Sequence, residues 1–300
     1  MQEIKSWKVW SNFFGYFIIF ILGASIAAIP RFIKGFDNET GLLVSISEII
    51  RIFIAILLLY WYTKYVVKLP LNIPTLNAKS LNMGLWILIG LSLPILTVVT
   101  FYITGNLSVR NIDTELSRSY IFDAILKAFG VSLASGFVEE IIFRGYLFNL
   151  LKSKYNFGIS AFAPSLFFTL IHIGGAGSLL NIFQLIVAGL LFSFMSLMIY
   201  VYTNSIWNAG IVHFLWNLLL LNGLIAFRTG GKNEVLVQLN IGDNPLFNGG
   251  DFGIETSIPA IIIYGLTSLI LWKLYKKKQH TTINIGHLAD NAKNEDNRNL

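Results

Sequence analysis

The chain has 300 residues, of which 55% are hydrophobic and only 13% carry charged side chains. Soluble domains have about a quarter of their residues charged, so this composition excludes a water-soluble globular protein and indicates a membrane protein. The sequence contains no cysteine, which excludes disulfides, thiolate nucleophiles and cysteine-bound metals. Its net charge of +6 lies largely in the termini and short loops, so we expect neither a nucleic acid nor a nucleotide as a partner.

Eight apolar segments along the chain predict membrane-spanning helices. About 20 apolar residues cross a hydrocarbon core of roughly 30 Å, at ~1.5 Å per residue. We therefore expect an all-α fold, a polytopic membrane helix bundle with about eight transmembrane helices that forms one domain over residues 1–275. The predicted spans are 11–30, 41–63, 81–104, 121–150, 157–173, 179–202, 204–225 and 257–275.

The distribution of lysine between the loops predicts the orientation of these helices. Loops on one side contain lysines, whereas loops on the other side carry mixed charge or none. The lysines concerned are Lys5, Lys8, Lys64, Lys68, Lys79, Lys152, Lys154 and Lys276 to Lys278. By the positive-inside rule their side is the cytoplasm, and eight spans place both termini there, in the cell membrane. A cleaved signal peptide is an alternative for the first segment, because two lysines precede an apolar stretch that ends in small residues.

Two hydrophilic segments lie outside the predicted spans. Residues 276–300 are rich in Asn, Lys, Asp and Thr with few apolar side chains, which predicts a disordered cytoplasmic tail. Residues 228–255 combine several glycines with a short alternating stretch around Val237, which predicts a short hairpin or a lid on the outer face. Nothing in this second segment indicates catalysis.

Ionisable side chains inside the predicted spans are the strongest functional signal. Placing one at mid-membrane costs at least ~2.5 kcal/mol, so such residues are rare and usually functional. Here they cluster in the second half of the chain. This cluster comprises Glu139, Glu140 and Arg144 in the fourth span, His172 at the end of the fifth, and His213 with the polar Asn217 in the seventh, whereas Glu48 and Arg51 lie apart in the second.

Helix geometry distinguishes the two adjacent glutamates. Glu140 and Arg144 are four residues apart, so they share a helical face and are expected to form an ion pair. Glu139 lies about 100° around the helix and should face another neighbour. A carboxylate held away from water and from a cation is a good general base, so Glu139 is the better candidate. The alternative for Glu140 and Arg144 is a purely structural pair, as we expect for Glu48 and Arg51.

Two further residues share a face of the seventh span. His213 and Asn217 are also four residues apart, and both side chains can donate hydrogen bonds. Two such donors in a dry site are the usual means of stabilising the oxyanion that forms when water attacks a carbonyl. Interhelical hydrogen bonding without catalysis is the alternative. His172 precedes three glycines, whose small size leaves room for water or a peptide.

The three motifs Glu139-Glu140-x-x-x-Arg144, Phe168-x-x-x-His172 and His213-x-x-x-Asn217 resemble a known signature. It is that of the CAAX-processing and bacteriocin-processing intramembrane proteases, also called the Abi or Rce1-type family, and the resemblance covers residues 120–225. It implies an intramembrane endopeptidase that cleaves a membrane-anchored protein or peptide. In that family Glu139 and His172 would activate water, while His213 and Asn217 would hold the oxyanion. Glu140 and Arg144, with Phe168, would support the site.

The use of a metal and two other functions stay open at the level of sequence. A Zn²⁺ ion would take its ligands from Glu139, His172 and His213, although the His-Glu-x-x-His spacing of familiar zinc proteases is absent. Water activated by the glutamate alone is equally compatible with the motifs. Serine and aspartyl mechanisms are disfavoured, because neither Gly-x-Ser-x-Gly nor Gly-x-Gly-Asp occurs. The alternative functions are a proton-coupled transporter that uses the same Glu and His cluster, and a catalytically idle immunity protein.

Overall fold

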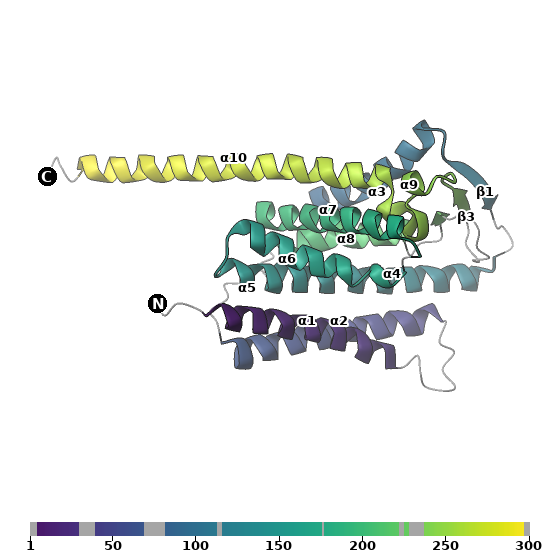
Figure 1. Ribbon diagram of the computed structural model, residues 1–300, viewed down its shortest axis with the longest axis horizontal. Helices are drawn as coiled ribbons and strands as arrows, with labels where there is room; N and C mark the ends of the chain where they lie inside the picture. The colour runs from purple at the N-terminus through teal and green to yellow at the C-terminus, as the bar shows by residue number, and fades with distance from the viewer. Residues whose placement is uncertain are drawn as a thin grey trace.

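The computed structural model describes residues 5–29, 40–68, 82–112, 116–175, 177–221, 225–227 and 237–296. It is an all-α bundle, as predicted, whose long helices run side by side along the long axis of the molecule, with a small β-sheet at one end (Figure 1). The start of helix α1 (Ser6–Ala28) and the end of helix α10 (Ile258–Asp296) lie at the other end of the bundle. Two further helices of the first half of the chain are α2 (Gly41–Tyr62) and α3 (Met83–Ile103).

The helices that carry the predicted site lie in the second half of the chain. Helix α4 (Arg118–Glu140) continues through a π-helical turn, η5 (Ile141–Leu147), into α5 (Phe148–Lys152), so that all three form one continuous helix. The remaining helices are α6 (Phe157–Leu170), α7 (Leu179–Thr203), α8 (Ile206–Leu220) and the short α9 (Pro245–Asn248). The shorter helical turns are η2 (Thr63–Val67), η6 (Ile173–Gly175) and η7 (Gly250–Thr256).

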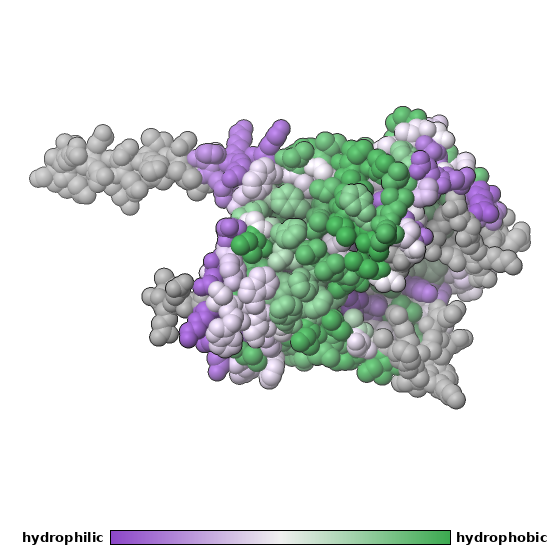
Figure 2. All heavy atoms as spheres, viewed as in Figure 1, coloured by the Kyte–Doolittle hydropathy of each residue, from purple (hydrophilic) through white to green (hydrophobic). Residues whose placement is uncertain are grey.

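The surface of the bundle is that of an integral membrane protein. Six helical segments in the described part of the chain are long and apolar enough to cross a membrane. In the view of Figure 2, hydrophobic residues cover the middle of the molecule and hydrophilic residues gather toward its ends. Helices α6 and α8 have only 14 and 15 residues, so the number of helices that cross the bilayer and their orientation stay predictions.

Helix α10 continues beyond the last predicted span. Its backbone is helical to Asp296, well beyond Lys276, where we expected a disordered tail to begin. The lysines and polar residues that follow its apolar part do not interrupt the helix, because none of them is a proline or a glycine before Gly286. The division into a membrane domain and a cytoplasmic tail stays a prediction.

Polar caps set where the site helices begin and end. The Asn156 side chain accepts a hydrogen bond from the Ile159 amide at 3.0 Å and starts α6, while Ser178 caps α7 by accepting from the Asn181 amide at 3.2 Å. Asn204 has a left-handed backbone, with φ of 56°, and ends α7. The chain can therefore reverse within two residues and lay α8 beside α7.

Glycines bring α4 and α8 unusually close together. A Cβ atom on Gly136 would lie 2.8 Å from the backbone nitrogen and Cα of Phe214, and one on Gly210 would lie 2.5 Å from the Phe137 ring. Each helix thus presents a glycine to the other at the crossing. Because His213 adjoins Phe214, this close contact sets its distance from the glutamates at the end of α4.

We expect the Gly136→Ala variant to lose most of its activity and about 1–3 kcal/mol of stability, because the added methyl group must push the two backbones apart. Thermal unfolding in detergent would measure the stability, and an assay of the peptide hydrolysis that the sequence resemblance implies would measure the activity. Gly265→Ala in α10 is the control, since a Cβ atom there meets nothing within 4 Å. Equal behaviour of the two variants would contradict the proposed role of the α4–α8 contact.

The small sheet and the segment after it cover one end of the bundle. Strand β3 (Val237–Asn240) lies between β1 (Ser108–Ile112), to which it is antiparallel, and β2 (Ile225–Phe227), to which it is parallel. The alternating stretch predicted as a hairpin or a lid therefore pairs with β1 from another loop and with β2 from the same connection after α8; residues 228–236 lie outside the described residues. We call residues 245–256, which comprise α9 and η7, the cap.

Hydrogen bonds attach the cap to the start of α7. The Gln184 side chain donates to the carbonyl oxygens of Pro245 and Leu246 at 3.1 and 3.0 Å. The Asp251 carboxylate accepts from the Gly177 amide at 2.8 Å and from the Asn181 side chain. These contacts place the cap beside the ends of the helices that carry the predicted site.

Candidate active site

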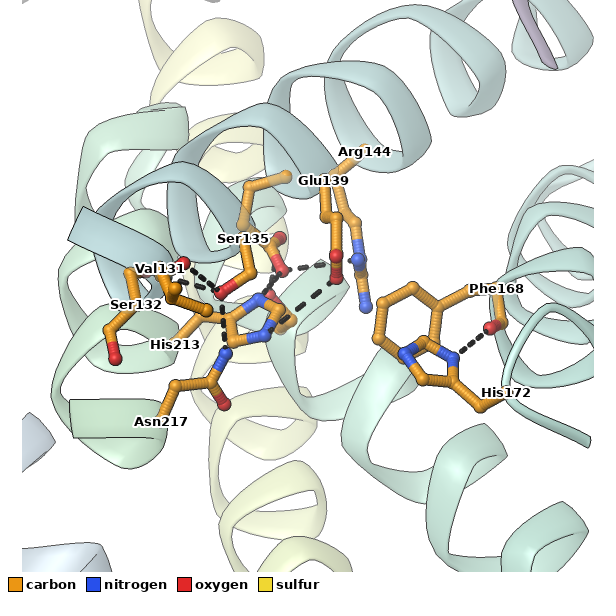
Figure 3. A network of polar contacts seen from close by, with 11 residues as sticks. Val131, Ser132, Ser135, Glu139, Arg144, Phe168, His172, His213 and Asn217 are labelled. Atoms are coloured by element: carbon orange, nitrogen blue, oxygen red, sulfur yellow. Dashed lines mark hydrogen bonds and ion pairs between the residues drawn. The ribbon is translucent and has the colours of Figure 1, made fainter. Parts of the chain in front are cut away.

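The predicted site residues come together from three parts of the bundle (Figure 3). Glu139 and Glu140 end α4, and Arg144 follows in η5. Phe168 lies on α6, and His172 follows the end of that helix. His213 and Asn217 lie on α8. All these side chains except His172 are buried.

Glu140 is the most completely enclosed of these residues. Its Oε1 atom lies 2.9 Å from His213 Nδ1 and 3.1 Å from Arg144 Nη1, and its Oε2 atom accepts a hydrogen bond from the Ser196 hydroxyl at 2.5 Å. The ion pair with Arg144 is the one that the i, i+4 spacing predicts. A fully buried carboxylate needs such partners, because desolvation is costly without them. Glu140 is therefore engaged on both oxygens.

Arg144 is held by its charge and by an aromatic ring. The guanidinium carbon lies 4.6 Å from the centre of the Phe168 ring, which is a cation–π contact. None of its three side-chain nitrogens forms a hydrogen bond with the described residues, although Nη1 lies within ion-pair distance of Glu140. The Phe168 position in the second motif thus has a physical reason, since the ring covers the buried cation.

His213 lies between the two glutamates. Its Nδ1 atom faces Glu140, and its Nε2 atom lies 3.9 Å from Glu139 Oε2. A neutral ring that donates its Nδ1 proton to Glu140 carries a lone pair on Nε2. A protonated ring can donate from both nitrogens. Which hydrogen-bonding role Nε2 plays toward a substrate therefore depends on the protonation of this ring.

Glu139 is the freer of the two carboxylates. Its Oε2 atom lies 3.9 Å from His213 Nε2, and its carboxylate forms no hydrogen bond with the residues that the structure describes. It faces a cavity, whereas Glu140 lies behind the cavity wall. The different surroundings that helix geometry predicts for the two residues are thus present.

Asn217 is oriented by a serine that we did not single out from the sequence. Its Nδ2 atom donates to the Ser135 hydroxyl at 2.9 Å, and that hydroxyl donates to the Val131 carbonyl at 2.9 Å (Figure 3). One amide hydrogen of Asn217 is used in this way. The second is available to a group in the cavity.

His172 is oriented by the helix that it follows. Its Nδ1 atom lies 2.8 Å from the Phe168 carbonyl oxygen (Figure 3). Because a carbonyl can only accept, Nδ1 carries the hydrogen, and the Nε2 atom of a neutral ring has a lone pair. That nitrogen can accept a hydrogen bond from a water molecule.

One cavity of about 190 Å³ contacts all four predicted catalytic residues. Glu139, His172, His213 and Asn217 line it together, beside the Phe168 ring. Aromatic side chains of Phe192, Trp216 and Tyr264 form further parts of its wall. A mostly apolar cavity with a few converging polar groups is the usual form of a small-molecule or catalytic site.

Residues 121–219 match the family model described as type II CAAX prenyl endopeptidase Rce1-like. This segment is similar to the Rce1-like family. It extends from α4 to α8 and contains all three motifs, so the resemblance seen in the sequence is confirmed. The match implies a membrane protease, in general of the CAAX type. No curated protein and no solved structure matches the chain.

The Rce1-like segment does not arrange its residues as a zinc site. The predicted ligands Glu139, His172 and His213 all reach the cavity, and each ring has its Nε2 atom available. Within the described part of the chain, however, no three His, Asp or Glu side chains are grouped so that they could hold a metal ion. The residues present thus do not fit the four-coordinate geometry that zinc requires.

Three residues at the site that sequence reasoning missed lie outside the three motifs. Ser196 on α7 contacts Glu140, and Glu255 in the cap lines the cavity. Ser135 had a detectable signal, since it lies four residues before Glu139 on the same helix. Glu255 lies just before the last predicted span, which is a weak signal. Nothing local distinguishes Ser196 from other serines.

Proposed function

We propose that the protein is an intramembrane endopeptidase that hydrolyses a peptide bond of a membrane-anchored protein or peptide. The observation that carries this proposal is the convergence of Glu139, His172, His213 and Asn217 on one cavity inside an apolar bundle. The family match supports the reaction class, and its description, a CAAX prenyl endopeptidase, suggests a prenylated C-terminal peptide as the first substrate to test.

In this proposal Glu139 and His172 act on the attacking water. Glu139 accepts a proton from the water, because its carboxylate faces the cavity and the ion pair of Arg144 is formed with Glu140 instead. The Nε2 lone pair of His172 accepts a hydrogen bond from the same water and orients it. The water oxygen then attacks the carbonyl carbon of the substrate.

Asn217 and His213 stabilise the oxyanion that this attack creates. Asn217 donates its second amide hydrogen, and His213 donates from Nε2 when the ring is protonated. Glu139 next delivers its proton to the leaving nitrogen, the C–N bond breaks, and the products are a carboxylate and an amine. Glu140 and Arg144 position His213 and the end of α4.

We further propose that the protein lies in the cell membrane with both termini in the cytoplasm. Two observations support this orientation. Lysines gather in the predicted cytoplasmic loops, and the start of α1 and the end of α10 lie at the same end of the bundle in Figure 1. The sheet and the cap would then face the opposite side of the membrane.

Reconstitution of the full chain in liposomes with a farnesylated reporter peptide tests the proposed reaction. We expect new peptide termini by mass spectrometry, in amounts that increase with enzyme and time. The same liposomes, with a membrane-anchored peptide library in place of the reporter, extend the test to other substrates. Absence of any cleavage, together with a pH-dependent solute flux, would overturn the proposal in favour of a proton-coupled transporter.

We expect Asn217→Ala to lower kcat by about 10²–10³-fold, which is the usual cost of removing one oxyanion donor. Ser135→Ala should have a smaller effect, because it leaves the amide of Asn217 in place and removes only its anchor. Steady-state kinetics on the reporter peptide measure both. A larger loss in Ser135→Ala than in Asn217→Ala would argue against a direct role of the amide.

A further inference from the structure

A second cavity, on the lipid-facing side of the bundle, is almost entirely apolar. It is a groove of about 390 Å³, within the range of about 300–1,000 Å³ that ligand pockets occupy. Phe157, Gly158 and Phe162 of α6, Leu191 and Phe194 of α7, and Trp272 of α10 line it. Its lining includes one hydroxyl group, that of Ser165, which already donates to the Ala161 carbonyl at 2.7 Å. The groove thus suits a hydrocarbon chain.

Two lysines stand at one end of this groove. Lys152 Nζ lies 5.9 Å from the centre of the Phe157 ring, and Lys276 Nζ lies 4.9 Å from the centre of the Trp272 ring. The two rings are themselves only 5.6 Å apart. Both ammonium groups therefore lie beside the same aromatic end of the groove, and both side chains are exposed.

The charge of this end is not balanced by the neighbouring sequence. Residues 141–233 and 256–289, which include the helices that form the groove, contain neither Asp nor Glu. Hydrophilic residues of α10 gather just beyond its apolar part, at the end of the bundle where the termini lie (Figure 2). A ligand that satisfies both features has an apolar chain and an anionic head.

We propose that this groove binds an anionic phospholipid, with an acyl chain along α6 and α7 and the phosphate beside Lys152 and Lys276. Lysines near a membrane surface attract anionic lipids, and two lysines beside the same groove concentrate this attraction at one site. Lysines that only extend their ammonium groups to the membrane–water interface, without a groove beside them, would not make one site prefer an anionic over a neutral phospholipid. Lipid binding at this groove does not require that the protein be a protease.

Native mass spectrometry of the full-length protein in detergent, titrated with phosphatidylglycerol or phosphatidylcholine of the same acyl chains, tests this proposal. We expect preferential retention of phosphatidylglycerol, weakened roughly tenfold in the Lys152→Gln, Lys276→Gln double variant. Lys64→Gln is the matched control, because Lys64 also lies 5.3 Å from aromatic rings but on η2, away from the groove. Equal retention of the two lipids by the unmodified protein would overturn the proposal.

A second variant tests the groove itself. Gly158→Trp fills the groove from an exposed glycine of α6, and we expect it to reduce retention of both lipids while thermal unfolding stays close to that of the unmodified protein. Unchanged retention would show that the chain does not lie there. Soluble glycerol phosphate, tested in parallel, should not compete; competition would indicate an anion site without a lipid chain. If the Gly158→Trp variant retained phosphatidylglycerol normally but cleaved a lipidated reporter at an altered rate, the groove would bind the lipid anchor of the substrate, and the proposal would be overturned.

Discussion

The Glu139→Gln variant should lose activity by about 10²–10⁴-fold in kcat while it remains folded. This is the usual contribution of a general base, and glutamine keeps the size of the side chain but cannot take up the proton of water. Stability should change little, because the Glu139 carboxylate forms no hydrogen bond with the described residues and lies 3.9 Å from His213. Steady-state kinetics on the reporter peptide and thermal unfolding in the same detergent measure the two quantities.

Glu48→Gln is the control for this experiment. Glu48 is likewise a buried glutamate within a predicted span, but its 3.2 Å ion pair is with Arg51 on α2, and it does not line the catalytic cavity. We expect that variant to keep normal turnover. Full activity in Glu139→Gln would eliminate the carboxylate as the base and leave His172 as the residue that activates water.

The Arg144→Met variant should lose about 3–5 kcal/mol of stability. Removal of one partner from a buried ion pair leaves the other charge uncompensated, and Glu140 has no exposure through which water could replace the arginine. The loss of the contact with the Phe168 ring adds to this effect. Thermal or denaturant unfolding of the protein in detergent, compared with the unmodified chain, gives the change.

A double variant separates charge from packing at this pair. In Glu140→Gln, Arg144→Met the buried charge is absent from both sides, so stability should recover by a substantial part of the loss. Arg51→Met tests a more accessible pair, whose arginine side chain is 13% exposed, and should cost less. Additive losses in the double variant would mean that the two residues act independently and that the ion pair is not what stabilises η5.

The helices and the main polar contacts could be predicted because they depend on neighbouring residues. Apolar length indicates a helix in a membrane, and i, i+4 spacing places Glu140 beside Arg144. Each of the eight predicted segments does contain a helix. The two shorter ones, α6 and α8, show why a helix and a membrane crossing are separate predictions.

Contacts between distant parts of the chain could not be predicted in the same way. Ser196 reaches Glu140 across 56 residues, and Glu255 reaches the cavity through a cap that is attached to α7 by Asp251. No residue near Ser196 or Glu255 in the sequence indicates that these side chains contact Glu140 or the cavity. The catalytic roles of the motif residues could not be predicted from neighbouring residues either. The structure brings these side chains together, and enzyme kinetics on variants assign the role of each.

The π-helical turn η5 makes the site sensitive to the length of the chain as well as to its composition. A π-turn contains an extra residue relative to an α-helix, so deletion of one residue between Ile141 and Leu147 would leave an ordinary, unbroken helix. Everything beyond the deletion would keep nearly its present orientation, because a π-turn winds less per residue than the ~100° of an α-helix. Lys152 would therefore stay beside the apolar groove, whereas Arg144, inside the turn, would shift relative to Glu140. The extra residue of η5 thus belongs to the buried ion pair, and its removal would change the catalytic end of this helix without turning the membrane-facing groove.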